Sequence, residues 1–293
     1  AELIGKLRGR PLLGGEEGVR LSLAGAQDKL AVIVHGDVIG LAKGGRPTTH
    51  ILKPVIQGLE GTVENELFCL RLAGRRNLPV PAVEMRWSGE TAFLLIERYD
   101  RARTPAGHID RLHQEDFCQA LSIPPELKYE EEGGPGTERS IDLINRACGR
   151  PAADRLRFIR MLLLQYLVGN ADAHGKNYAL LYHGNTPDLA PLYDVVCTAA
   201  YPRLAKKLAM KIGGRAVPNT IQLKHWLTLV PDTKAAQRLL ISDIANLAGN
   251  IDGEAAALLV ELSDAGVQHP ILKTVRGVIA TRAAHLLRII DRA

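Results

Sequence analysis

The sequence predicts an α+β chain of two lobes, a small β-rich N-terminal lobe and a larger helical C-terminal lobe. Two observations support this fold class. Up to residue 100 the chain reads mostly as strands, with β-branched runs and alternating patterns bounded by glycine turns. Beyond residue 110 apolar residues recur mostly at helical spacing. We therefore expect lobes at residues 1–100 and 101–293, with the polar segment 100–110 at their boundary and a nucleotide-sized cleft between them.

The N-terminal lobe is expected to contain six strands and one helix. The helix covers residues 63–73, with Thr62 as its N-cap and Gly74 as its end. Pro54 ends the preceding strand or places it at a sheet edge, because proline cannot donate to a ladder. The strands are predicted at 18–25, 30–34, 38–41, 49–53, 83–87 and 91–99.

The C-terminal lobe is expected to be helical apart from one hairpin at 178–193. The segment 128–136 combines three acids with three glycines and reads as a loop. Helices are predicted at 114–121, 140–148, 153–168, 221–229, 234–248, 253–264 and 271–292.

Composition is that of an ordinary globular protein, with 46% hydrophobic and 24% charged residues among 293. No apolar run reaches the ~20 residues that a membrane span needs, so we expect no membrane and a cytoplasmic location. The net charge of +5 is too small and too scattered to indicate nucleic-acid binding by itself. The four cysteines are far apart in apolar contexts, which predicts buried free thiols rather than a zinc site.

Residues 170–178 hold the densest group of reactive side chains, between two apolar segments. Asp172 and Asn177 are five apart, the interval between the proton-accepting Asp and the metal-binding Asn of a kinase catalytic loop. We expect Asp172 to be the base, and Asn177 with Asp194 to offer oxygen ligands to Mg²⁺. Lys176 would touch the transferred phosphate, and His174 would chiefly brace the loop. Helix capping or an Asx turn is the alternative for either residue taken alone.

The N-terminal lobe offers the matching half of an ATP site. Lys53 ends a strand, as the phosphate-binding lysine of kinases does, and Glu66 on the following helix is preferred over Glu64 as its partner. The backbone at Glu97 and Tyr99 lies where an adenine edge would be read. A turn of small residues would cover the phosphates closely with its backbone; it comprises Ser22, Ala24, Gly25, Ala26 and Gln27.

These residues resemble the HipA family of bacterial Ser/Thr protein kinases, the toxins of type II toxin–antitoxin pairs. The resemblance covers residues 18–212 and rests on motifs in a fixed order: Ser22-Leu-Ala-Gly-Ala-Gln-Asp-Lys29, Thr49-His-Ile-Leu-Lys53, Glu66 with Cys69, Glu97-Arg-Tyr-Asp100, Gln114-Glu-Asp-Phe-Cys-Gln119, Lys128-Tyr-Glu with Gly133-Gly-Pro-Gly136, Asp172-Ala-His-Gly-Lys-Asn177, Tyr193-Asp194 and Lys207-Leu-Ala-Met210. It implies a protein-kinase-like fold that uses ATP and Mg²⁺.

The resemblance also implies roles that residue patterns do not provide. Ser22 matches the serine that these kinases autophosphorylate, which ejects the covering loop and switches the enzyme off. A phosphate there would repel the phosphates of ATP. The best-known members phosphorylate an aminoacyl-tRNA synthetase and bind a DNA-binding antitoxin, so DNA is reached only through that partner. Full-length members carry a further N-terminal subdomain, so we expect this chain to be a short form or an excerpt.

Two alternatives to a protein kinase toxin stay open from the sequence. One is a small-molecule kinase of related fold, which only substrate assays would separate. The other is an ATP-binding interaction module without useful turnover. A binding module has no need of a base, so the presence of Asp172 beside Lys53, Asn177 and Asp194 argues against it.

Overall fold

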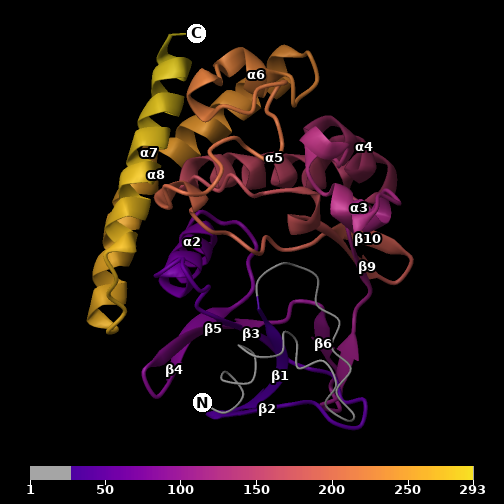
Figure 1. Cartoon of the computed structure of the whole chain (residues 1–293). Coiled ribbons are helices and arrows are strands. Elements are labelled where there is room, and N and C mark those ends of the chain that lie inside the picture. The colour runs from indigo at the N-terminus through magenta and orange to yellow at the C-terminus, as the bar shows by residue number, and fades with distance from the viewer. Residues whose placement is uncertain (1–27, 293) are drawn as a thin grey trace.

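The structure is a computed structural model that describes residues 28–292 and has two lobes (Figure 1). The smaller lobe is built on an antiparallel sheet of order β2-β1-β3-β5-β4. Its strands are β1 (Leu30–His35), β2 (Val38–Gly40), β3 (His50–Pro54), β4 (Val83–Ser88) and β5 (Thr91–Glu97). The predicted strand 18–25 and the covering turn with Ser22, Ala24, Gly25, Ala26 and Gln27 lie outside the described residues.

The sheet places Lys53 on the face that helix α2 (Thr62–Arg75) covers. Neighbouring residues of a strand point to opposite faces, and Leu52 packs into a cluster on the far face. Lys53 pairs across the ladder with Leu94, which belongs to the same core as the buried residues of α2. Lys53 thus points toward α2 because the strand alternates. Pro54 is the last residue of β3, a central strand, so it ends the strand without marking an edge.

Helix α2 differs from its predicted bounds at both ends. Gly61 is the N-cap and Thr62 the first helical residue, because the chain enters with a φ of 72° that favours glycine. A Cβ at Gly61 would also lie 2.5 Å from Nδ1 of His269. At the other end the helix runs through Gly74 to Arg75. Gly74 is the next-to-last residue of the helix, so it lies in the last turn and not in the helix interior, where a glycine is most costly.

The larger lobe is mainly helical, as predicted. Its principal helices are α3 (Phe117–Ala120), α4 (Thr137–Ala147), α5 (Pro151–Val168), α6 (Leu223–Leu227), α7 (Lys234–Asp264) and α8 (Ile271–Asp291). Its strands are β8 (Gln114–Asp116), β9 (Ala179–His183) and β10 (Thr186–Leu189), whereas the hairpin of β6 (Arg101–Arg103) and β7 (Ile109–Arg111) lies beside the smaller lobe (Figure 1). Long helices α7 and α8 run side by side along one edge of the molecule, next to α2 and α5 (Figure 1). One apolar core extends from α2 into α5, α7 and α8.

Two predictions about helices in this part of the chain were wrong. The predicted helix 114–121 is strand β8 followed by the single-turn helix α3, because Gln114–Asp116 pair with β9, more than sixty residues later. The polar segment 100–110 contains the β6–β7 hairpin. The predicted helices 234–248 and 253–264 are one continuous helix, since the side chains of Ile251 and Ala255 are fully buried and hold it through the two glycines. The division of the lobes at residue 100 stays a prediction.

The four cysteines are buried free thiols, as predicted. Among the described residues no helix is both long and apolar enough to cross a lipid bilayer.

Candidate active site

The ammonium group of Lys53 joins three segments that are distant in sequence. Its Nζ donates to Oε1 of Glu66 at 2.7 Å and to Oδ1 of Asp194 at 2.8 Å. The Lys53 and Glu66 side chains are 7% and 3% exposed, whereas Asp194 keeps 39% exposure. The predicted ion pair with Glu66 is therefore present, and Asp194 is the member that a ligand can reach.

The electrostatics of this triad favour the charged states of Lys53 and Asp194. Burial alone would lower the pKa of Lys53, but attraction to Asp194 and Glu66 raises it above its ordinary value. Burial would raise the pKa of Asp194, but Lys53 lowers it to about 2. Burial raises the pKa of Glu66, and Lys53 offsets only part of that effect. Near neutral pH the triad thus presents an ammonium beside the Asp194 carboxylate, the charges that a metal-bound polyphosphate requires.

Asp194 and Asn177, the two predicted metal ligands, lie together. Nδ2 of Asn177 donates to Oδ2 of Asp194 at 2.8 Å. Asp194 has a φ of 58°, a left-handed conformation that is uncommon outside glycine. Asn170 donates to the Asp194 carbonyl at 3.4 Å, so several contacts hold this strained residue in place. Strain of this kind concentrates where a side chain must be aimed at a ligand.

Two buried hydrogen bonds dock α2 against the segment that carries Asp194. Nδ2 of Asn65 donates to the Cys197 carbonyl at 3.1 Å, and the Cys197 amide donates to Oδ1 of Asn65 at 2.8 Å. Asn65 is fully buried, and it is the residue next to Glu66. This reciprocal pair positions Glu66 for Lys53. Sequence reasoning did not identify Asn65, because its partner is 132 residues away.

The candidate catalytic loop, residues 170–177, exposes Asp172 on a backbone held by hydrogen bonds. α5 ends at Gly169, whose φ of 76° turns the chain. The Asp172 amide donates to Oδ1 of Asn170 at 3.0 Å, and the His174 amide donates to the Asp172 carbonyl at 2.9 Å. The Ala171 amide donates to Oγ1 of Thr198 at 2.7 Å. The loop backbone is thus held by hydrogen bonds while the Asp172 side chain remains exposed, as a proton acceptor for a bound substrate would have to be.

Tyr129 contacts the candidate base directly. Its hydroxyl donates to Oδ1 of Asp172 at 2.7 Å, and its ring lies edge-on to His174 with centroids 5.2 Å apart. The amide of Gly175 donates to the Lys128 carbonyl at 3.2 Å, which ties the two segments together. Burial, with the Asp172 hydrogen bond, raises the pKa of Tyr129. Residues 128–136 were predicted as a loop without a role; the Lys128-Tyr-Glu motif was the signal that marked this contact.

Lys176 and His174 are both held within the loop region. Nζ of Lys176 donates to Oδ2 of Asp116 at 2.8 Å, so its ammonium lies against a carboxylate. His174 is 6% exposed, and its Nδ1 is buried without a hydrogen-bond partner among the described residues. Burial lowers the pKa of His174. His174 is therefore a buried imidazole beside Asp172 with one nitrogen unsatisfied among the described residues.

The predicted nucleotide contacts extend from the triad along β5. The Glu97 amide already donates to the Ala82 carbonyl at 2.9 Å, so Glu97 would meet an adenine through its carbonyl. The Tyr99 hydroxyl donates to Oε1 of Gln114 at 2.7 Å, which holds the segment after β5 against β8. Lys29, at the end of the covering-turn motif, has its pKa lowered by burial and then by repulsion from Lys53. The positive charges of Lys29 and Lys53 thus act on each other, as two cations that share a polyphosphate would.

The oxygen donors at this site suit a Mg²⁺ ion that is coordinated partly by its substrate, rather than a metal ion coordinated by protein side chains alone. No group of three or more His, Cys, Asp and Glu side chains with metal-binding geometry occurs within residues 28–292. Mg²⁺ is usually held by one or two protein oxygens together with substrate phosphates and water. The Asp194 carboxylate and the Asn177 carboxamide oxygen are ligands of that kind. They would hold the ion, and the phosphates would complete its coordination.

Comparison with known proteins agrees with this arrangement. Residues 21–257 match the family model described as the HipA-like C-terminal domain. The putative kinase Y4mE of Sinorhizobium fredii is 43% identical over 274 residues, which cover 94% of this chain and 65% of that relative. The serine/threonine-protein kinase toxin HipA of Shewanella oneidensis is 32% identical over 254 residues, covering 83% of this chain and 58% of the toxin. The chain thus spans about two thirds or less of these relatives.

Solved structures confirm the predicted two-lobed kinase-like fold. HipA in the complex of Shewanella oneidensis HipA, HipB and operator DNA superposes with a TM-score of 0.84 and 26% identity, covering 99% of this chain and 72% of HipA. The Helicobacter pylori proinflammatory kinase CtkA shares the fold alone, with a TM-score of 0.59 and 12% identity over 92% of this chain and 91% of CtkA. By the family match, the relatives and the fold together, this chain belongs to the HipA-like family.

Proposed function

We propose that this chain is an ATP-dependent serine/threonine protein kinase of the HipA type. The observation that carries the proposal is the Lys53 ammonium bonded to both Glu66 and Asp194. This linkage joins the two lobes at the point where the phosphates of ATP would lie. Kinases use such a lysine, paired with a helix glutamate, to hold the phosphates of ATP. The names of the relatives, putative kinase and protein kinase toxin, support the same reaction class.

The proposed reaction moves the γ-phosphoryl group of ATP to a serine hydroxyl of a protein. The bond between the hydroxyl oxygen and the γ-phosphorus forms as the bond from that phosphorus to the β,γ-bridging oxygen breaks, and ADP leaves. Asp172 accepts the hydroxyl proton, while Lys53 and Lys29 balance charge on the phosphates. Mg²⁺ bound by Asn177 and Asp194 would neutralise further charge on the phosphates. Lys176 and His174 are proposed to support the transferred group from within the loop.

The proposal also covers the contacts with the adenine and phosphates of ATP, the protein substrate and an antitoxin partner. The backbone at Glu97 and Tyr99 would read the adenine edge, and the covering turn with Ala24, Gly25 and Ala26 would close over the phosphates. The resemblance makes an aminoacyl-tRNA synthetase the first substrate to test. The solved structure of Shewanella oneidensis HipA is that of a complex with HipB and operator DNA. We propose a similar antitoxin partner here, with DNA reached only through it.

Incubation with radiolabelled ATP and a bacterial cell extract should transfer label to protein in the presence of Mg²⁺ but not of EDTA. A purified aminoacyl-tRNA synthetase provides the specific arm of this assay, and phosphoamino-acid analysis should show phosphoserine. Label that appears only in small molecules would replace the protein-kinase proposal with a small-molecule kinase. Mg²⁺-dependent ATP binding with no transfer to either class would favour the interaction module.

We further propose that the chain phosphorylates itself at Ser22. A new phosphate carries close to two negative charges at neutral pH and would repel the ATP phosphates from the covering turn. Mass spectrometry of the chain recovered from the same reaction should locate the phosphate at Ser22. Phosphate found on another residue would remove Ser22 from this regulation.

Tyr129→Phe is expected to lower kcat without changing KM for ATP. The Tyr129 hydroxyl holds one oxygen of the Asp172 carboxylate, which leaves the other oxygen oriented for the substrate. A hydrogen bond of this type contributes about 0.5–1.5 kcal/mol, so kcat should fall about two- to tenfold. Steady-state kinetics measure this effect, and the unfolding temperature should fall by no more than about a few degrees, as the loss of one hydrogen bond predicts. A rise in kcat would instead show that the hydroxyl competes with the substrate for Asp172.

A further inference from the structure

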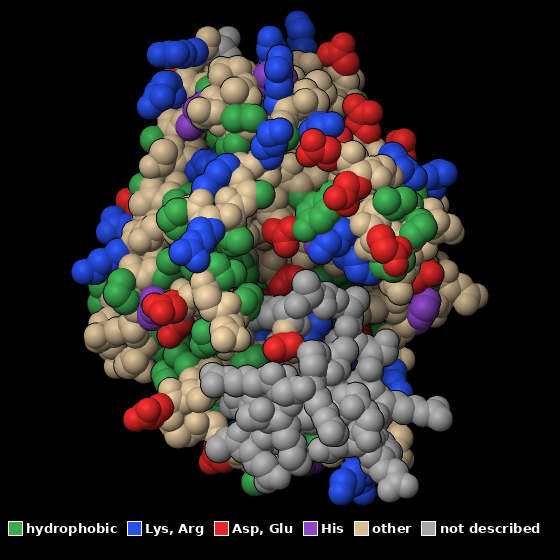
Figure 2. Space-filling model, viewed as in Figure 1, with side chains coloured by type: hydrophobic (Ala, Val, Ile, Leu, Met, Phe, Trp, Pro, Cys, Tyr) green, Lys and Arg blue, Asp and Glu red, His purple; other side chains and the backbone are tan. Residues whose placement is uncertain are grey.

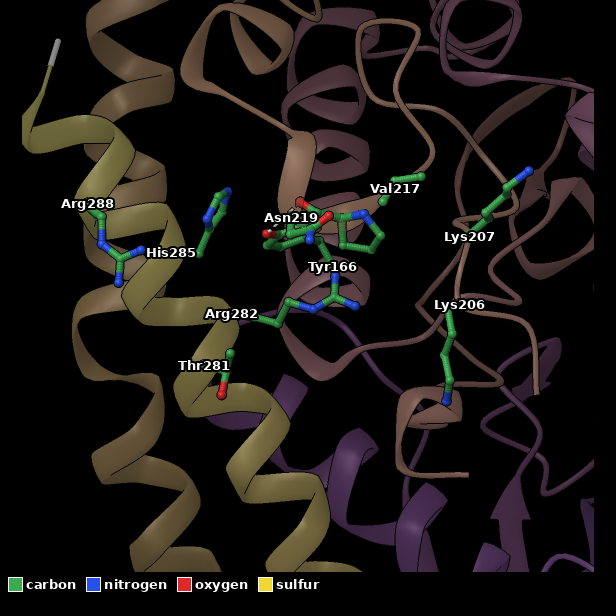
Figure 3. Close-up of a pocket in the computed structure, with 10 residues that line it drawn as sticks. Tyr166, Lys206, Lys207, Val217, Asn219, Thr281, Arg282, His285 and Arg288 are labelled. Atoms are coloured by element: carbon green, nitrogen blue, oxygen red, sulfur yellow. Dashed lines mark hydrogen bonds between the residues drawn. The ribbon is translucent and has the colours of Figure 1, made fainter. Parts of the chain in front are cut away.

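A pocket lies in the larger lobe, formed by residues that the candidate active site does not use. It has a volume of about 560 Å³ and is lined by Tyr166, Lys206, Lys207, Val217, Pro218, Asn219, Thr281, Arg282, His285 and Arg288 (Figure 3). These residues come from four segments: α5, the loop 206–207, the turn η6 (Pro218–Thr220) with Val217 before it, and α8. Sites for small-molecule ligands usually have volumes of roughly 300–1,000 Å³, so this pocket is large enough for one.

The charges around this pocket are all of one sign. Lys206, Lys207, Arg282 and Arg288 line it, and no Asp or Glu does. None of these four cations forms a salt bridge with any carboxylate in the part of the chain that the structure describes, whereas Arg276 on the same helix pairs with Asp252. Lys and Arg side chains also gather along the left margin of the face in Figure 2, where Figure 1 places α7 and α8. A cluster of cations without carboxylate partners attracts anions.

Arg282 is the group whose surroundings point most directly to a ligand. Its guanidinium lies over the Tyr166 ring, 4.8 Å from the centroid, and extends between Tyr166 and the loop of Lys206 and Lys207 (Figure 3). Its Nη1 is buried and has no hydrogen-bond partner among residues 28–292. A buried charged donor without a partner is costly. An anion in the pocket would supply the missing acceptor.

Two other polar groups of the pocket, Lys206 and His285, are held by hydrogen bonds to backbone carbonyls. Nζ of Lys206 donates to the Tyr201 carbonyl at 2.8 Å and to the Ala199 carbonyl at 3.3 Å. His285 makes a 2.8 Å hydrogen bond to the Ile221 carbonyl through Nε2. These contacts hold in place the wall of the pocket that Lys206 and His285 form, before any ligand binds. The Ala199 amide also donates to the Gly169 carbonyl at 3.0 Å, so the wall is attached to the start of the catalytic loop.

We propose that this pocket binds a small phosphate-bearing molecule. Arginine forms bidentate hydrogen bonds with phosphate oxygens, and clustered cations match a ligand of two or more negative charges. Apolar surface from Tyr166, Val217 and Pro218 suits the organic part of such a molecule. The recessed position of Arg282 on Tyr166 favours a small molecule over duplex nucleic acid, whose rigid backbone contacts side chains that project from a surface. This site is independent of the proposed kinase reaction.

Inorganic pyrophosphate, titrated in EDTA and followed by calorimetry, tests the proposal. Lys207→Gln and Arg288→Gln each remove one exposed cation of the pocket and should weaken binding about tenfold. Lys273→Gln is the matched control, since this exposed residue lies on α8 about 22 Å along the helix axis from Arg288. It should leave the affinity unchanged. The paired variant Lys53→Met with Glu66→Gln reports binding at the active site and should not weaken the pocket titration.

Tryptophan fluorescence locates the binding event. Trp226 is fully buried and lies edge-on to Tyr166 with ring centroids 5.6 Å apart, and the chain's other tryptophan, Trp87, is exposed. In a Trp87→Phe background, pyrophosphate should therefore change Trp226 emission with the affinity that calorimetry gives. Equal affinities for the pocket variants and Lys273→Gln, or loss of binding only when Lys53 is replaced, would overturn the proposal. A short DNA duplex that binds through Lys207 and Arg288 while pyrophosphate does not would also overturn it.

Discussion

Asp172→Asn is expected to lower the rate of phosphoryl transfer by about 10²- to 10⁴-fold, the usual contribution of a positioned general base. The amide has the shape of the carboxylate but does not accept a proton at neutral pH. The two backbone hydrogen bonds at residue 172 do not involve the side chain, and the Tyr129 hydroxyl can donate to the amide oxygen as it does to Oδ1. We therefore expect the fold to be unchanged.

Transfer of radiolabel from ATP measures the loss of activity, and thermal unfolding shows whether the fold is unchanged. Asp142→Asn is the matched control, since Asp142 is an exposed residue of α4 away from the site, and it should keep full activity. Asp172→Asn should still bind ATP, because Lys53, Asn177 and Asp194 are untouched. Kinase activity within a few-fold of the unmodified chain would show that another group accepts the proton.

Lys53→Met is expected to remove activity and also to destabilise the fold. It leaves the Glu66 and Asp194 carboxylates together without their cation. Breaking a buried pair in this way costs about 3–5 kcal/mol. We expect the lower end of that range, because Asp194 is 39% exposed and the raised pKa of Glu66 lets it take up a proton more easily. ATP with Mg²⁺ should no longer raise the unfolding temperature.

Adding Glu66→Gln to Lys53→Met separates the two effects. The neutral amide removes the repulsion between the carboxylates, so urea unfolding should show most of the lost free energy restored. Activity and ATP-dependent stabilisation should stay absent, since the phosphate-binding ammonium is still missing. Recovery of activity together with stability would mean that Lys53 serves only to hold the lobes together.

The order of elements could be predicted from the sequence where local patterns decide them. The strand pattern at 49–53 put Lys53 near a strand end, and helical spacing favoured Glu66 over Glu64 as its partner on the next helix. The five-residue interval between Asp172 and Asn177 identified the candidate catalytic loop, because both residues lie in the same short segment of the chain. These are short-range regularities, and each was present in the structure as expected.

Elements that depend on distant partners were missed or misplaced. Gln114–Asp116 are a strand only because β9 pairs with them, and apolar spacing alone suggested a helix. Asn65 acquires its importance from Cys197, and Tyr129 from Asp172, 43 residues away. The break predicted near residues 249–253 followed from glycine propensity, which tertiary burial overrode.

The sequence by itself determined the two-lobed fold class, the family and the chemical identity of the candidate site, because these reside in local patterns and ordered motifs. Only the tertiary structure decided which charges meet. Lys53 is bonded to Asp194 across 141 residues, and the cationic pocket joins residues from Tyr166 to Arg288. Electrostatic interactions depend on distance in space and on burial, and neither can be read from positions along the chain.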